Sequence, residues 1–183
     1  MTQYPAPEIA TVSPWTRRLG WVIGGWLVVV TIASLNQPSW PLRRGALFLH
    51  LAGLVAGFGA VLVADVHGVL WLVGQRRLAD LLQITSALQP LIWAGMIALV
   101  ASGLLLHPNI SLLRTKIKLV LVLVATINGM WAHQLTKQLA AQTGDAPAHV
   151  DQRLLLKVMG SGAISQGAWW GATLIGFLAT TSR

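Results

Sequence analysis

Four histidines occupy positions where a membrane-embedded cofactor site would need them. His50 and His107 lie near one end of two apolar stretches, and His67 and His133 lie near the opposite end of two such stretches. A neutral imidazole is the usual axial ligand of haem iron and a common ligand of other metals. Two histidine pairs at two depths therefore predict a cofactor near each membrane face, with haem b favoured over copper.

The same histidines leave other interpretations open. Because each residue of a helix is rotated by about 100° from the one before it, His50 and His67 point about 100° apart and do not share one face. His107 is followed by Pro108, which favours an extended backbone rather than a helix at that position. His149 falls in a hydrophilic loop and needs no special role. Haem b, copper and no cofactor at all are the three interpretations of these histidines.

Asp65 is the only acidic residue inside a predicted apolar span. An ionised carboxylate in hydrocarbon is costly, so an intramembrane acid indicates a functional role. Asp65 suits a proton relay, a metal ligand alongside His50 or His67, or a partner that orients a histidine. A structural acid paired with Arg76 or Arg77 near the interface is the alternative. If Asp65 has a functional role, the protein could be a proton-coupled or copper-related transporter in which Asp65 and His67 line the transport path.

Lys118 is a further site candidate, at the start of the fourth apolar stretch. Arg114 lies four residues earlier, so the two cations share one helix face. Together they suit an anionic lipid headgroup, a haem propionate or an anionic substrate. Snorkelling of both side chains to the interface is the simpler explanation.

Asn128 is a site candidate in the middle of the same stretch, and Ser161, Ser165 and Gln166 are polar residues of the last one. Such side chains either tie helices together through hydrogen bonds or line a small polar cavity. The sequence has no Walker loop, nucleophile elbow or zinc-protease helix motif, so enzymes built on those motifs have no support. If the protein takes part in a redox reaction, we expect it to do so as a membrane-bound redox component.

The elements that carry these residues are apolar helices. The chain of 183 residues is 55% hydrophobic and only 10% charged, which excludes both an ordinary soluble domain and a disordered chain. It has no cysteine, which excludes disulfides and cysteine-ligated metal centres. A spanning helix needs about 20 mostly apolar residues. We predict an all-α, multi-pass bundle of about five transmembrane helices: residues 19–35, 46–74, 90–106, 112–133 and 158–179, in one domain (19–180) after a tail (1–18).

The connections between these spans are short, with two exceptions. Residues 78–89 form an amphipathic segment that either lies on the membrane surface or continues into the third span across Pro90. Residues 134–157 form the only substantial hydrophilic loop, with its break expected at residues 143–147.

The thirteen lysine and arginine residues, which bring the net charge to +8, all lie in tails, loops or span ends. They divide seven to six between the two faces, so the positive-inside rule does not decide the orientation, and we favour a cytoplasmic N-terminus. Their position predicts contacts with lipid headgroups of the bilayer and no nucleic-acid partner.

Small residues recur at every fourth position of the second stretch, as Ala52, Ala56, Ala60, Ala64 and Gly68, with Gly53 and Gly57 beside them. The fifth stretch repeats the pattern with Ala163, Gly167 and Gly171. Helices in lipid associate through such residues because they let backbones approach closely. These ridges predict packing within the bundle, or binding of partner membrane subunits by a non-catalytic accessory subunit or assembly factor.

Several short motifs of this chain are similar to those of a known family. Leu49-His50-Leu51 leads into Gly57-Phe58-Gly59, Ser102-Gly103 closes the next stretch, and Lys116-Ile117-Lys118-Leu119 opens one that reaches Asn128. In these motifs residues 46–134 resemble the copper-resistance D (CopD) family of bacterial multi-pass membrane proteins. The resemblance implies a helical bundle of the bacterial inner membrane and a role in copper handling, for which His50 is the first residue to test. Because Cu(I) prefers sulfur ligands and cysteine is absent, the same frame also suits haem.

Overall fold

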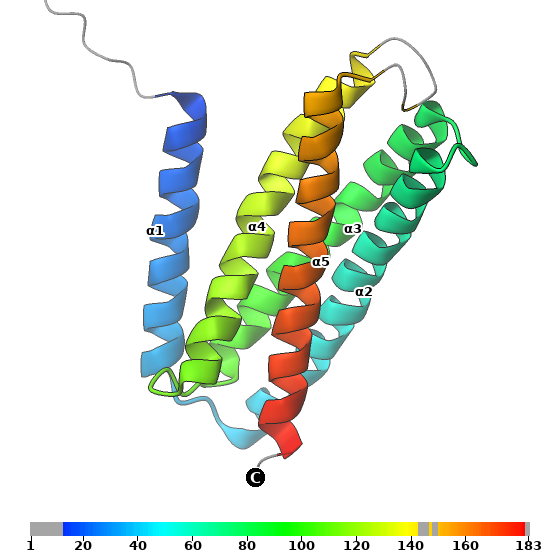
Figure 1. Ribbon diagram of the computed structural model, residues 1–183. Helices are drawn as coiled ribbons and strands as arrows, with labels where there is room; N and C mark the ends of the chain where they lie inside the picture. Colours follow the sequence, from blue (N-terminus) through cyan, green and yellow to red (C-terminus); the bar gives the residue numbers. More distant parts are fainter. Residues whose placement is uncertain (1–12, 143–146, 148–149, 182–183) are drawn as a thin grey trace, which may run out of the picture.

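The computed structural model describes residues 13–142, 147 and 150–181, and this part of the chain consists of helices and their connections. Figure 1 shows the helices running up and down: α1 (Pro14–Leu35), α2 (Trp40–Leu72), α3 (Leu78–Leu105), α4 (Leu113–Ala140) and α5 (Gln152–Thr181). The all-α prediction is therefore confirmed. In the described chain, α1 to α4 are long and apolar enough to cross a membrane, which makes the protein a multi-pass membrane protein.

The fifth predicted span, residues 158–179, lies within α5, which is not among these four candidates. Ser161, Ser165 and Gln166 lower its hydropathy. Figure 1 shows α5 running antiparallel to α4 along its length, and its crossing of the membrane stays a prediction. Ser161 is buried in the bundle, so part of the polar character of α5 faces other helices rather than lipid.

The helices extend beyond the predicted spans. α2 already begins at Trp40, and α4 continues past residue 133 to Ala140. Hydropathy marks only the part in hydrocarbon, whereas a helix satisfies its own backbone hydrogen bonds and can continue into the headgroup region. The predicted loop 134–157 was therefore wrong at both ends, because α4 covers its beginning and α5 starts at Gln152. Its expected break at 143–147 lies mostly outside the described residues.

Residues 78–89 are the first turns of α3, which runs through Pro90 as one helix, so the alternative of a separate surface helix was wrong. Asp80 fixes the start of α3 by accepting a hydrogen bond from the backbone N–H of Arg77 at 3.3 Å. Gly74 turns the chain between α2 and α3 with a φ of 76°, a left-handed conformation that suits glycine. The tight turn makes α2 and α3 a helical hairpin.

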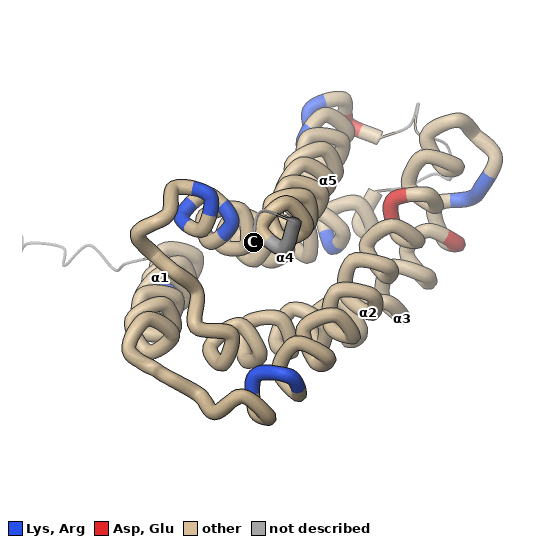
Figure 2. The backbone as a smooth tube through the Cα atoms, turned by 90° about the horizontal axis from the view of Figure 1, so that it is seen from below, with Lys and Arg blue, Asp and Glu red and all other residues tan. Residues whose placement is uncertain are grey.

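The bundle consists of two antiparallel pairs, α2 with α3 and α4 with α5, within which most of the helix contacts occur. Figure 1 shows α1 standing beside these pairs, and the view along the helices in Figure 2 shows the pairs facing each other. α1 contacts α3 and α4 but buries only Ala33. Most of α1 is consequently accessible to lipid.

The α2–α3 pair meets at a close crossing of three glycines. A Cβ atom built on Gly95 would lie 2.5 Å from the Cα of Gly57 and 2.7 Å from the carbonyl oxygen of Gly53. The predicted ridge is the contact line only in part, because Ala52 is exposed while Ala60, Gly53 and Gly57 are buried. A shift of one residue rotates the contact face by about 100°.

The α5 series behaves in a similar way. Ala163 and Gly167 are exposed, whereas a Cβ on Gly171 would lie 2.9 Å from the Cδ1 of Leu121 on α4. Only the last member of the series therefore meets a neighbouring helix of this bundle at close range. Binding of partner subunits through the exposed small residues stays a prediction.

Two apolar clusters hold the pairs together. The central cluster consists of Phe58, Val61, Met96, Leu99, Ala125, Ala168 and Trp169. The N-terminal cluster, nearer the side where α1 begins, consists of Trp71, Leu78, Leu81, Leu135, Leu139, Val150 and Leu154. Both clusters contain residues of α2, α3, α4 and α5, and the N-terminal cluster also contains Val150 just before α5. Each cluster therefore joins the two helix pairs at a different depth.

Figure 2 shows the lysine and arginine residues of the described chain near the helix ends, as predicted. Arg76, Arg77, Arg153 and Lys157 lie on the side of the N-terminal cluster, and Arg43, Arg44, Arg114 and Lys116 lie on the opposite side. Arg44 stacks over the ring of Trp40, with its guanidinium carbon 3.9 Å from the ring centroid. These positions suit lipid headgroups on both faces.

Candidate functional site

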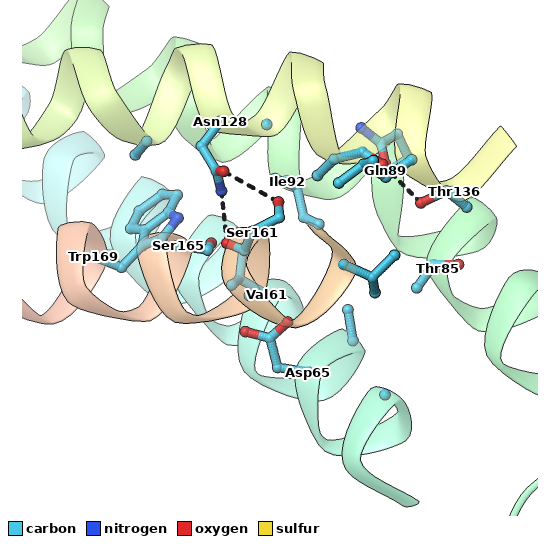
Figure 3. Close-up of a pocket in the computed structure, with 18 of the residues that line it drawn as sticks. Val61, Asp65, Thr85, Gln89, Ile92, Asn128, Thr136, Ser161, Ser165 and Trp169 are labelled. Carbon is cyan, nitrogen blue, oxygen red and sulfur yellow. Dashed lines mark hydrogen bonds between the residues drawn. The ribbon is translucent and has the colours of Figure 1, made fainter. Parts of the chain in front are cut away.

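A cavity of about 180 Å³ lies between the two helix pairs (Figure 3). It is placed between the central cluster and the N-terminal cluster, both of which contribute residues to its wall. Its polar lining residues come from four helices: Asp65, Thr85, Gln89, Thr126, Asn128, Thr136, Ser161 and Ser165. The volume exceeds what one water molecule requires, so the cavity can hold a small solute.

Asp65 is the acidic group of this cavity. Figure 3 shows its carboxyl group pointing from α2 toward the segment of α5 that carries Ser161 and Ser165. The Gln166 side-chain amide donates a hydrogen bond to Oδ2 of Asp65, and Trp170 Nε1 donates to Oε1 of Gln166 at 3.0 Å. This chain of bonds fixes the carboxyl at the wall of the cavity and links α2 to α5.

The hydroxyl groups of the cavity wall are oriented by their own helices. Thr85 donates to the carbonyl of Leu81 at 2.7 Å, Thr126 donates to Val122 at 2.8 Å, and Thr136 donates to Ala132 at 2.9 Å. A hydroxyl has one hydrogen, so each of these oxygens is left with acceptor capacity only. These three hydroxyls are therefore acceptors toward the cavity, and no lysine, arginine or histidine of the described chain lines it.

Asn128 joins α4 to α5 at the same cavity. Its amide nitrogen donates to the carbonyl oxygen of Ser161 at 3.0 Å, and the Ser161 hydroxyl donates to Asn128 Oδ1 at 3.1 Å. Both residues are buried, with 6% and 3% of their surfaces exposed. The sequence predicted either a helix tie or a cavity lining for Asn128, and the structure places it in both.

The Asn128–Ser161 pair should be measurable as a coupling energy. We expect a double-mutant cycle of Asn128→Ala and Ser161→Ala to give a coupling of about 1 kcal/mol, the usual size for a hydrogen bond between membrane helices. The measurement is the free energy of unfolding in mixed micelles titrated with denaturing detergent. A matched cycle of Asn128→Ala with Ser165→Ala should give a value near zero. Equal couplings in the two cycles would contradict the assignment.

His50 and His107 each bond a different partner. His50 Nδ1 lies 2.8 Å from Ser102 Oγ on α3. His107 lies beyond the end of α3, with a φ of 47°, and its Nδ1 bonds the carbonyl of Asn36 at 2.6 Å. His107 therefore closes the connection between α1 and α2 onto the end of α3, and it does not face the cavity lining.

His67 and His133 also lie away from the cavity lining. His67 Nδ1 bonds the carbonyl of Val63 on its own helix at 2.9 Å. His133 is exposed, and it lies seven residues inside α4 rather than at its end. Of the predicted transporter path, the cavity therefore contains Asp65 but not His67. His149 lies outside the described residues.

The predicted metal set of His50, His67 and Asp65 does not form a cluster. His50 lies seventeen positions before His67 in α2, which corresponds to about 25 Å of helix. Among the described residues no group of three or more histidine, aspartate or glutamate side chains could hold a metal ion. Ligation of haem b or copper by these histidines stays a prediction.

Lys118 faces the inside of the bundle. Its Nζ lies 3.4 Å from the position a Cβ would take on Gly176 of α5, and it is within electrostatic range of His50. Exposed Lys116 lies two positions earlier on α4. A metal cation at His50 would therefore face a second positive charge, which disfavours the copper role implied for this residue.

Sequence reasoning missed Thr85, Gln89, Thr126 and Thr136 as lining residues. Gln89 and Thr85 lie in the segment before Pro90, which hydropathy excluded from the third span. Threonine is common in membrane helices and carries no charge that would single it out. A signal was nevertheless present, because Thr85 and Gln89 are four residues apart and share one helix face.

Searches against family profiles, curated proteins and solved structures found no match for this chain. The resemblance of residues 46–134 to the CopD family consequently stays a prediction, and the function has to be argued from the geometry of the cavity.

Proposed function

We propose that the protein is a proton-coupled transporter of small organic cations, with the cavity as its binding site and Asp65 as the group that binds either the proton or the substrate. The observation that carries the proposal is the carboxyl group of Asp65 in a wall whose three threonine hydroxyls donate within their own helices and are left as acceptors (Figure 3). Donor-rich cations such as protonated amines and guanidinium match such a wall in charge and in hydrogen bonding.

The electrostatics support a cation rather than an anion. Asp65 is the only charged residue in the described cavity lining. In a low-dielectric interior an unpaired carboxylate is costly, and it is neutralised either by a proton or by a bound cation. The two compete for the same oxygens, so one proton leaves for each cation that binds. Trp169 adds an aromatic face to the wall, which is favourable for a cation.

The architecture supports transport rather than simple binding. Along the helix axes the central cluster lies on one side of the cavity, and the N-terminal cluster lies on the other. Contacts between the two helix pairs are fewer than contacts within each pair. A rocking motion of one pair against the other would open the cavity to each side in turn.

Guanidinium flux in proteoliposomes tests the proposal. We expect an outward proton gradient to drive uptake of radiolabelled guanidinium, with proton movement reported by a trapped pH-sensitive dye. Asp65→Asn keeps the shape of the side chain and removes the exchangeable charge, so uptake should fall at least about tenfold, the effect of about 1.4 kcal/mol. Tetramethylammonium has the same charge without N–H donors and should be a poor substrate.

Asp80→Asn is the matched control. Asp80 is an acid of α3 outside the cavity lining, where it accepts a hydrogen bond from Arg77. Asparagine also caps helices, so this variant should fold and transport at the wild-type rate. Wild-type guanidinium uptake by Asp65→Asn, or equal losses in the two variants, would refute the proposed role.

A further inference from the structure

Beyond the central cluster, on the side away from the cavity, four helices bring polar side chains together. His50 comes from α2, Ser102 from α3, Lys118 from α4 and Thr173 from α5. Thr173 lies one turn from Gly176, where the Lys118 ammonium group is placed. This group, termed the basic site, is not part of the cavity or of the transport proposal.

Thr173 provides the observation that points to a ligand. Its hydroxyl oxygen is buried and has no hydrogen-bond partner among the described residues. Three half-buried threonines of the described chain behave differently, since Thr85, Thr126 and Thr136 all donate to a carbonyl four residues earlier. Buried polar atoms are almost always satisfied, so a free donor at this position indicates a group that supplies an acceptor.

Lys118 has no acidic side chain beside it among the described residues. The acidic residues of the described chain are Asp65, Asp80 and Asp151, and all of them lie on the other side of the central cluster. Lys118 is half-buried and turned toward α5. A cation held inside a bundle is stabilised by a nearby anion, and none of these acids can supply it.

His50 and Ser102 form the wall of the same site. Ser102 donates its one hydroxyl hydrogen to the carbonyl of Ala98 at 2.6 Å, so its oxygen accepts from His50 Nδ1–H. That bond fixes the imidazole ring and leaves Nε2 as an acceptor, so the donors of the site are Lys118 and Thr173.

We propose that the basic site binds an anionic oxygen group, a phosphate or carboxylate, held by the Lys118 ammonium and the Thr173 hydroxyl. Ammonium and hydroxyl donors are the groups that recognise such oxygens. The anion can come from a lipid headgroup that enters between the helices or from a free solute. Both sources present the same anionic oxygens to the site, and the two arms of the experiment below distinguish a lipid headgroup from a free solute.

The experiment titrates the full chain, purified in an uncharged detergent, and follows its melting temperature by tryptophan fluorescence. One arm uses sodium phosphate against sodium chloride at constant ionic strength. The other uses a short-chain phosphatidylglycerol below its micelle concentration. We expect a saturable rise in melting temperature in at least one arm, because a ligand that binds only the folded state stabilises it. The arm that saturates identifies the source of the anion.

Variants test the residues of the site. Lys118→Met should weaken the apparent affinity about tenfold or more, the effect of losing one charge-assisted hydrogen bond. Lys116→Met removes an exposed charge two positions away and should leave the affinity unchanged. Thr173→Val preserves the shape of the side chain, removes only the hydroxyl and should weaken binding about threefold or more. If Lys118→Met does not fold, Thr173→Val carries the test alone.

Two results would overturn the proposal: no saturable stabilisation in either arm, or equal losses of affinity in Lys116→Met and Lys118→Met. Asp65→Asn should retain the wild-type affinity for the anion, because Asp65 lies on the far side of the central cluster. Failure of the basic site is therefore distinguishable from failure of the transport proposal.

Discussion

Gly95→Ala will lower the free energy of unfolding of the detergent-purified protein by about 3 kcal/mol, the upper part of the range for overpacking. The added methyl group would lie 2.5 Å from both the Cα and the backbone nitrogen of Gly57 and 2.7 Å from the carbonyl oxygen of Gly53. All three are backbone atoms, so no side-chain rotation can relieve the overlap. The two helices must separate, and the close contact that drives their association in lipid is lost.

Gly103→Ala is the control for this prediction, because it makes the same change on the same helix. No described atom lies within 4 Å of a Cβ built on Gly103, and alanine has the higher helix propensity. We expect this variant to be neutral or slightly stabilising. The measurement for both variants is unfolding by denaturing detergent, followed by circular dichroism. A Gly95→Ala protein as stable as Gly103→Ala would contradict the glycine crossing.

Phe58→Ala will lower stability by about 3 kcal/mol and will also make the bundle leaky. Phe58 stacks on Trp169, with ring centroids 5.5 Å apart and planes 1° apart. It also meets Trp170 edge-on at 4.9 Å. Its removal leaves a hole in the central cluster, which separates the cavity from the basic site. Water can then enter across this barrier.

The leak is measured as proton entry into dye-loaded proteoliposomes in the absence of guanidinium. Phe58→Ala should raise this rate several-fold, whereas Phe58→Leu fills most of the hole and should leave it near the wild-type value. Phe48→Ala is the matched control on α2, because Phe48 is 76% exposed and faces away from the core. Equal leak rates in Phe58→Ala and Phe48→Ala would rule out the central cluster as a barrier.

The fold class and the approximate spans could be predicted because both depend on local composition. Apolar stretches of sufficient length must be helical in lipid, whatever their neighbours are. The exact ends could not be predicted, since α4 continues to Ala140 through a segment that is no longer strongly apolar. Hydropathy reports the position of the hydrocarbon and not the end of a helix.

The candidate site was predicted in part. Asp65 stood out because its charge is costly in any membrane helix, and the structure places it at a cavity. The histidine pairs stay a prediction, because depth along the bundle was the only evidence for the pairing. His50 instead faces Ser102 of α3, and His107 bonds the connection after α1. Depth along the bundle follows from sequence, but rotation about each helix axis does not.

The sequence by itself determined that this chain lies in the bilayer as an all-α bundle with its bases at the helix ends and one acid inside a span. The tertiary structure alone decided which faces meet. It placed Gly53 and Gly57, rather than Ala52, at the close contact with α3, and it turned Asp65 toward the cavity and Lys118 toward α5. The physical reason is that apolar helices have no preferred partner face in lipid, so close packing and polar satisfaction between helices fix their rotation.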